Sequence, residues 1–256
     1  ERQCDLVVNW MRVGFIHGVM NTDNMTVSGE TIDYGPCAFM DTYDPKTVFS
    51  SIDHNGRYAY CNQPGITKWN LARFAECLIP FFERDQKKAI QIATETINDF
   101  EKKYEEKWMN MMRNKLGISG LDNNDKPLIL DILTWMHEKK ADYTNTFCHL
   151  MNLDPKKEKI FEDSKFIVWK KRWKERLLKN DNNQIKSKEL MKNNNPLVIP
   201  RNHKIEEALE AAELNDMEPI NKILEILKNP YDKQSEIIDY QYPSKSSEKY
   251  QTFCGT

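Results

Sequence analysis

Three side chains that can hold a metal ion and move a proton lie close together in the sequence: Asp23, Asn24 and Asp33. Residues 25–32 between them alternate weakly between apolar and polar side chains and include Ser28-Gly29, which predicts a small hairpin. The two ends of a hairpin lie side by side, so we expect Asn24 and Asp33 to be neighbours, with Asp23 next to them. Two hard oxygen ligands that leave room for water and phosphate oxygens are typical of Mg²⁺, or Mn²⁺ in its place, at phosphoryl-transfer sites.

The spacing of these residues is that of a protein-kinase catalytic loop. Kinases place a metal-binding Asn seven residues after the His of H-R-D-x-x-x-x-N, and a metal-binding Asp in a following D-F-G motif. Here Asn24 lies seven residues after His17, and Asp33-Tyr34-Gly35 stands in the place of D-F-G. The position of the kinase catalytic Asp holds Val19, and the nearby carboxylate is instead Asp23. An ordinary protein kinase should not tolerate that change, because its substrate hydroxyl needs a proton acceptor there.

The segment Val13-Gly-Phe-Ile-His-Gly-Val-Met-Asn-Thr-Asp-Asn-Met25 resembles the signature of the selenoprotein O family of protein adenylyltransferases, also called YdiU. The resemblance is dense up to about residue 78 and is thinner but collinear to the end of the chain. Further matching segments are residues 31–36, 39–41, 43–45, 55–58, 60, 63–64, 69–71, 115–117, 141–142, 195–196, 201–202, 208–213 and 230–231.

This resemblance implies a kinase-like fold that binds ATP in an inverted pose and transfers AMP to Ser, Thr or Tyr hydroxyls of proteins. Carried over by position, Asp23 matches the family's proton acceptor, and Asn24 and Asp33 match its magnesium ligands. Asp33 also belongs to the nucleotide site. The inverted nucleotide accounts for Val19, because it moves the reacting phosphorus relative to the loop.

The expected fold is mainly α: a protein-kinase-like C-lobe with a small β-hairpin at the metal site, followed by a helical extension. We expect the C-lobe at residues 1–180, a polar linker at 181–195, and the extension and tail at 196–256. Nothing before Asp23 offers a Gly-rich phosphate loop or a strand lysine, which the family carries upstream. The chain is therefore expected to be the C-terminal half of a longer enzyme that lacks its N-lobe here.

Several helices are predicted from apolar spacing. Residues 90–111 carry an apolar stripe at steps of three and four, and Gly117 closes the run. Residues 166–178 carry Trp169 and Trp173 among basic side chains; a docked helix with a solvated basic face is favoured there over contact with nucleic acid or anionic lipid. The strand-like segments are placed between Met25 and Tyr60. The part at residues 57–60 is interpreted either as one wall of a protein-substrate groove or as purely structural.

Composition bounds the partners and the compartment. The formal net charge of −2 gives no general electrostatic footprint for nucleic acid, and no apolar run approaches the roughly 20 residues of a membrane span. The resemblance implies a mitochondrial location in a eukaryote and a cytoplasmic one otherwise. The six cysteines include no C-x-x-C pair. Cys254 matches the family's redox-active terminal position, and an inert frayed tail is the alternative.

Two other functions remain open at this point. Asp23, Asn24 and Asp33 can hold a metal-bound nucleotide, but they determine neither which nucleotide binds nor its pose. Transfer of a γ-phosphoryl or a uridylyl group is therefore one alternative. The other is a non-catalytic interaction domain made by truncation.

Overall fold

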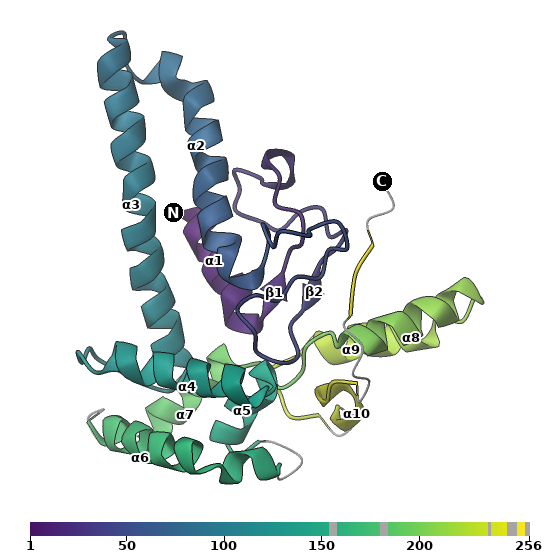
Figure 1. The fold of residues 1–256 in the computed structure, drawn as a ribbon. Helices are drawn as coiled ribbons and strands as arrows, with labels where there is room; N and C mark the ends of the chain where they lie inside the picture. Colours follow the sequence, from purple (N-terminus) through teal and green to yellow (C-terminus); the bar gives the residue numbers. More distant parts are fainter. Residues whose placement is uncertain (154–157, 180–183, 235–236, 245–249, 254–256) are drawn as a thin grey trace.

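The computed structural model describes residues 1–153, 158–179, 184–234, 237–244 and 250–253, and it is mainly helical, as the sequence predicts (Figure 1). The α-helices are α1 (Arg2–Val13), α2 (Gln63–Phe82), α3 (Gln86–Lys115), α4 (Asp125–Lys139), α5 (Tyr143–Leu150), α6 (Ser164–Leu178), α7 (Gln184–Asn194), α8 (Asn202–Glu213), α9 (Glu218–Leu227) and α10 (Ile238–Gln241). The shorter elements are the strands β1 (Phe15–Ile16) and β2 (Ala38–Phe39) and the 3₁₀ turns η1 (Thr22–Asn24), η2 (Tyr60–Asn62) and η3 (Lys159–Glu162).

The strands differ from the prediction in place. The two strands that form a ladder are β1 and β2, which pair antiparallel with Phe15 opposite Phe39, and β1 precedes the stretch in which strands were expected. The predicted hairpin at residues 25–32 is reduced to one antiparallel bridge between Met25 and Thr31, because Gly29 at φ +78 turns the chain back at once. Residues 57–60 form no strand.

Helices α2 and α3 form a long hairpin that extends beyond the rest of the molecule (Figure 1). Asp85 caps α3 by accepting hydrogen bonds from the backbone N–H groups of Lys87 and Lys88. The predicted stripe is buried at Ala93 and Phe100, but Ile90 near the outer end of the hairpin is 46% exposed. The helix ends before Gly117, whose φ of +69 is the left-handed conformation expected of a closing glycine.

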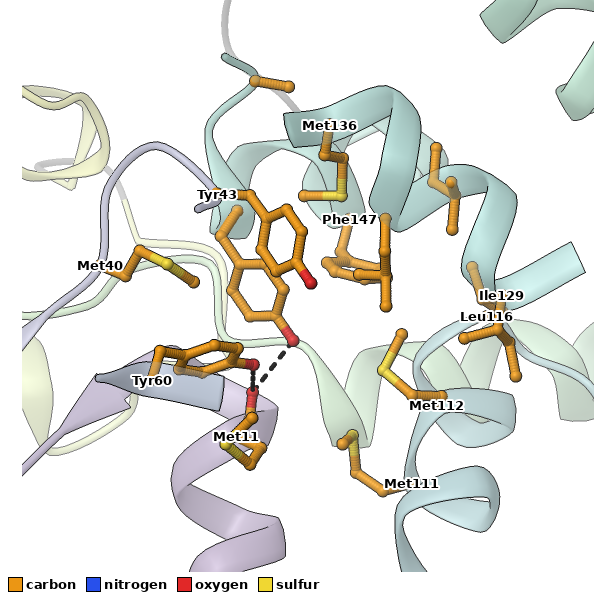
Figure 2. Close-up of a cluster of buried hydrophobic side chains, with 14 of the residues drawn as sticks. Met11, Met40, Tyr43, Tyr60, Met111, Met112, Leu116, Ile129, Met136 and Phe147 are labelled. Carbon is orange, nitrogen blue, oxygen red and sulfur yellow. Dashed lines mark hydrogen bonds between the residues drawn. The ribbon is translucent and has the colours of Figure 1, made fainter. Parts of the chain in front are cut away.

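Side chains from other elements hydrogen-bond to carbonyls in the last turn of α1. The hydroxyls of Tyr60 and Tyr143 both donate to the carbonyl of Met11, at 2.7 and 3.0 Å (Figure 2). The Lys115 ammonium donates to the carbonyl of Arg12 at 2.8 Å, and burial lowers the pKa of Lys115 well below its usual range. Carbonyls in the last turn of a helix have no partner within it, so these three side chains join α1 to three other parts of the chain.

Helix α6 is docked, as the tryptophan spacing predicts. The indole N–H groups of Trp169 and Trp173 donate to the carbonyls of Leu128 and Leu116, each at 2.8 Å. Both rings are buried, and between them Lys171 and Arg172 are exposed. Asp163 caps the helix from the preceding residue.

The predicted linker at 181–195 differs in secondary structure, because residues 184–194 form α7 and residues 181–183 lie outside the described part of the chain. The reason lies in two buried residues: the Met191 side chain enters the core, and the Asn195 amide donates to the carbonyl of Lys115 at 2.8 Å. The predicted boundaries between domains stay predictions.

Beyond α7 the chain is helical, as expected, and then extended. Residue Thr252 pairs in parallel with Ser50, so the tail lies along the segment that follows β2. Cys254 lies outside the described residues. Among the described residues, no helix combines the length and the apolar composition that crossing a membrane requires.

Candidate functional site

The three predicted site residues lie on two neighbouring loops. Asp23 and Asn24 belong to η1, and Asp33 comes two residues after the bridge that joins Met25 to Thr31. Asp23 and Asp33 are exposed, and neither forms an ion pair with any residue that the structure describes. Carboxylates left without a partner on ordered loops are suited to ligands that arrive from solution.

The amide of Asn24 is held in one orientation. Its Nδ2 donates to the carbonyl of Val19 at 2.9 Å, and its backbone N–H donates to the carbonyl of Asn21 at 3.1 Å. Because the nitrogen side of the amide is occupied by the loop itself, Oδ1 is left as the oxygen that can bind a cation. The donor set of Asn24 and Asp33 therefore fits a hard divalent ion.

His17 connects the two loops. The ring is fully buried, and its Nε2 donates to the carbonyl of Ile32 at 2.8 Å. The next residue, Asp33, has a φ of +55, a left-handed conformation that costs a non-glycine residue about 1–2 kcal/mol. The imidazole thus anchors the peptide that precedes a strained aspartate, and it acts as a positioning residue.

A glycine allows the same loops to touch. Gly18 has a φ of +88, and a Cβ placed on it would lie 2.6 Å from the carbonyl oxygen of Pro36. No side chain fits at that distance, so only glycine permits the loop that carries Asp23 to pack against the backbone beyond Asp33.

Two amide side chains on α2 form hydrogen bonds to the backbone of residues 15–20, which lead into the loop that carries Asp23. Gln63 Oε1 accepts from the backbone N–H of His17 at 3.0 Å, and Gln63 Nε2 donates to the carbonyl of Phe15 at 3.0 Å. Asn70 donates to the carbonyl of Met20 at 2.9 Å. Sequence reasoning assigned neither residue a role, although their spacing of seven places them on one face of a helix and both are polar in a helix that packs on the core.

A hydrogen bond joins the segment after β2 to the loop that carries Asp23. The Tyr58 hydroxyl donates to Asn21 Oδ1 at 2.7 Å, two residues before Asp23. Asp53 shapes this segment by accepting from the backbone N–H groups of Arg57 and Tyr58, both at 2.8 Å. That residues 57–60 form one wall of a protein-substrate groove remains a prediction.

A metal site at Asn24 and Asp33 would need ligands besides protein side chains. In the described parts of the chain, no three His, Cys, Asp or Glu side chains gather into a group that could hold a metal ion. Asn24 and Asp33 provide one amide oxygen and one carboxylate, so phosphate and water oxygens would have to complete an octahedral shell. That the two residues share one ion stays a prediction.

Comparison with known proteins identifies relatives of this chain. The family model described as "Protein adenylyltransferase SelO" matches residues 1–228. The chain is 60% identical to a protein nucleotidyltransferase YdiU of Pelagibacter ubique, 53% identical to one of Alcanivorax borkumensis and 50% identical to one of Clostridium perfringens. All of this chain is aligned in each case, but it spans only 53%, 53% and 52% of those relatives, about half their length. The chain belongs to the SelO family.

Proposed function

We propose that the complete protein transfers AMP from Mg²⁺-ATP to Ser, Thr or Tyr hydroxyls of proteins, and that this chain supplies the metal ligands and the proton acceptor. The observation that carries the proposal is the geometry of the two loops. His17, Gly18 and the bridge between Met25 and Thr31 join the loop that carries Asp23 and Asn24 to the loop that carries Asp33, which supports a shared site. The description of the family as an adenylyltransferase and the name of its relatives support the same reaction.

Each residue has one role in this proposal. Asp23 accepts the proton of the attacking hydroxyl, and the hydroxyl oxygen forms a bond to the α-phosphorus while the bond to the pyrophosphate leaving group breaks. Asn24 and Asp33 would hold Mg²⁺, and Asp33 also contacts the nucleotide. When bound, the metal neutralises charge on the phosphates. General-base assistance of this kind contributes about 10²–10⁴-fold.

The fold belongs to the proposal as well. We infer a kinase-like C-lobe from the order of His17, Asn24 and Asp33, and we infer that the remainder of the protein supplies the phosphate grip. The cellular compartment stays a prediction from the family: mitochondrial in a eukaryote and cytoplasmic otherwise.

The test uses the complete protein, a protein acceptor such as the enzyme itself, and three labelled nucleotides: ATP labelled at the α-phosphate, ATP labelled at the γ-phosphate, and UTP labelled at the α-phosphate. Label transferred from α-labelled ATP alone supports AMP transfer. Label from the γ-phosphate would show a kinase, label from UTP a uridylyltransferase, and none at all an interaction domain.

The variant Asp23→Ala should lose about 10²–10⁴-fold in transfer rate with an unchanged thermal midpoint, because Asp23 is exposed and has no partner to lose. Glu30→Ala is the matched control, since Glu30 is an exposed carboxylate on the connecting turn. Wild-type rates in Asp23→Ala would move the proton acceptor elsewhere.

A further inference from the structure

A cavity of about 900 Å³ lies between the end of α5, α6 and α7, and none of its lining residues belongs to the candidate site. Pockets that take small ligands commonly measure roughly 300–1,000 Å³. Its floor is apolar and is formed by Leu150, Met151, Leu153, Trp173, Leu177 and Met191.

Apolar surface also continues to the rim. Leu178 lines the cavity and is 62% exposed. The indole N–H of Trp173 is already bound to the carbonyl of Leu116, so that ring presents only apolar atoms to the cavity. The floor therefore suits a hydrocarbon group and offers no hydrogen bond from its largest side chain.

The charged side chains that line this cavity, among the residues that the structure describes, are all basic. They are Lys170 and Lys174 from α6 and Lys188 and Lys192 from α7. The chain as a whole has 37 basic and 39 acidic residues, so the excess of positive charge is a local property of this cavity. Such a field attracts an anion.

Within the described part of the chain, two of these lysines have partners and the other two have none. Lys192 pairs with Asp232 at 3.2 Å, and the Lys170 ammonium lies 3.2 Å from His149 Nε2. Lys174 and Lys188 form no ion pair with any residue that the structure describes. Lys174 and Lys188 line the same cavity from two different helices, so an anion bound in it can be attracted by both.

We propose that this cavity binds a long-chain carboxylate, with its hydrocarbon tail on Trp173, Leu177 and Met191 and its anionic head between Lys174 and Lys188. A hydrocarbon chain is favoured over a peptide because a peptide backbone would need hydrogen-bond partners that an apolar floor does not supply. The site is independent of the proposed AMP transfer.

The first experiment is calorimetry of the complete protein with three soluble probes below their micellar concentrations: dodecanoate, decanoate and dodecyltrimethylammonium. We expect saturable binding of dodecanoate at one site. Each buried methylene strengthens affinity about fourfold, so decanoate, which is two methylenes shorter, should bind about fifteenfold more weakly, and the cationic probe should not bind. Equal binding of the cation, or no saturable binding of dodecanoate, would overturn the proposal.

The second experiment locates the site. Lys174→Glu combined with Lys188→Glu should weaken dodecanoate binding by about tenfold or more, since each reversal replaces attraction by repulsion. Lys171→Glu is the matched control, because Lys171 is exposed on the same helix and does not line the cavity. Leu178→Asn should weaken the tail contact by a few fold without changing charge.

Lys174, Lys188 and Leu178 are exposed or only partly buried, so these variants should fold, which circular dichroism and the thermal midpoint can verify. An equal effect of Lys171→Glu and of the double variant would show that the lysines act only through net charge. Binding of an acidic amphipathic peptide in the place of dodecanoate would replace the lipid with a protein partner. Either result would reject the carboxylate site.

Discussion

At the scale of single residues, Gly18 gives the sharpest test of how the two loops meet. Gly18→Ala must place a Cβ 2.6 Å from the carbonyl oxygen of Pro36 and keep a φ of +88. We expect a loss of about 2–4 kcal/mol in the free energy of unfolding, from the left-handed backbone and the overpacking together. Urea denaturation measures it, and the transfer rate of the complete protein should fall with it.

Gly120 supplies the control for that variant. Its φ is +72, but a Cβ there would meet nothing within 4 Å. Gly120→Ala should therefore cost only the conformational part, about 1–2 kcal/mol. If the two variants lose the same free energy, the contact between Gly18 and Pro36 does not hold the loops together.

At the scale of elements, Asp163 joins the start of α6 to α4. Its carboxylate accepts from the backbone N–H of Lys165 and from the indole of Trp135, each at 3.0 Å, and pairs with Lys139 at 2.6 Å. The Lys139 ammonium, with the Trp135 indole and the helix N–H groups, lowers the pKa of Asp163 to about 2.

A lowered pKa in the folded state predicts the pH dependence of stability. The contribution of Asp163 is fully present above its ordinary pKa of 3.8 and is lost as the pH falls toward about 2. The difference in urea midpoint between the wild type and Asp163→Asn should thus be full at pH 5 and shrink toward pH 2. Lys139→Met, which keeps the cap, should show a smaller version of the same trend. A constant difference across this range would contradict the assignment.

The sequence predicted the elements whose pattern is long and regular. The α3 stripe, its closing Gly117 and the docked Trp169 and Trp173 all rest on repeated apolar spacing, and the structure confirms them apart from the exposed Ile90. The sequence also predicted that a small hairpin brings Asn24 and Asp33 together, and the structure retains one bridge of that hairpin, between Met25 and Thr31. What these residues do stays a prediction.

Other features depend on distant partners and left no local pattern. Strand β1 has only two residues, too few for a period to show. Helix α7 is polar along most of its length, and it packs on the core through Met191. Gln63 and Asn70 hold the segment around His17 by hydrogen bonds to its backbone. Backbone groups are the same in every residue, so the sequence does not show which of them a side chain will bind.

At the scale of the whole molecule, Arg201 joins three parts of the chain. The buried guanidinium pairs with Asp41 at 2.6 Å and with Asp142 at 2.7 Å, and it donates to the carbonyl of Gln241 at 3.0 Å. Arg201→Leu would leave two carboxylates without their partner, so we expect a loss of about 3–5 kcal/mol in the free energy of unfolding.

The exposed pair of Arg172 and Asp131 has the same 2.6 Å separation and serves as the control. Arg172→Leu should change the free energy of unfolding by about 0–1 kcal/mol. Arg201→Lys keeps the positive charge and loses the planar guanidinium. Its loss in the free energy of unfolding should lie between those of Arg172→Leu and Arg201→Leu. A loss below about 1 kcal/mol for Arg201→Leu would show that the buried network contributes little.

The chain by itself should bind nucleotide weakly and transfer little or nothing. The proposed ligands Asn24 and Asp33 would provide only two of the oxygens around a metal ion, and transfer reactions of phosphorus depend almost wholly on orientation and charge supplied by the full site. Calorimetry with Mg²⁺-ATP and an assay for labelled protein check this. Micromolar affinity together with robust self-labelling would show instead that these 256 residues form a working enzyme.

Arg201 and Asp41 form an ion pair although they lie 160 positions apart in the sequence. The pair can therefore form only late in the synthesis of this chain. Ribosomes add about 5–20 residues each second, so the segment that carries Asp41 waits roughly 8–30 s for its arginine. During that interval Asp41 lacks this partner. The segment that carries Asp41 is synthesised early in this chain, and the arginine that pairs with it is synthesised late.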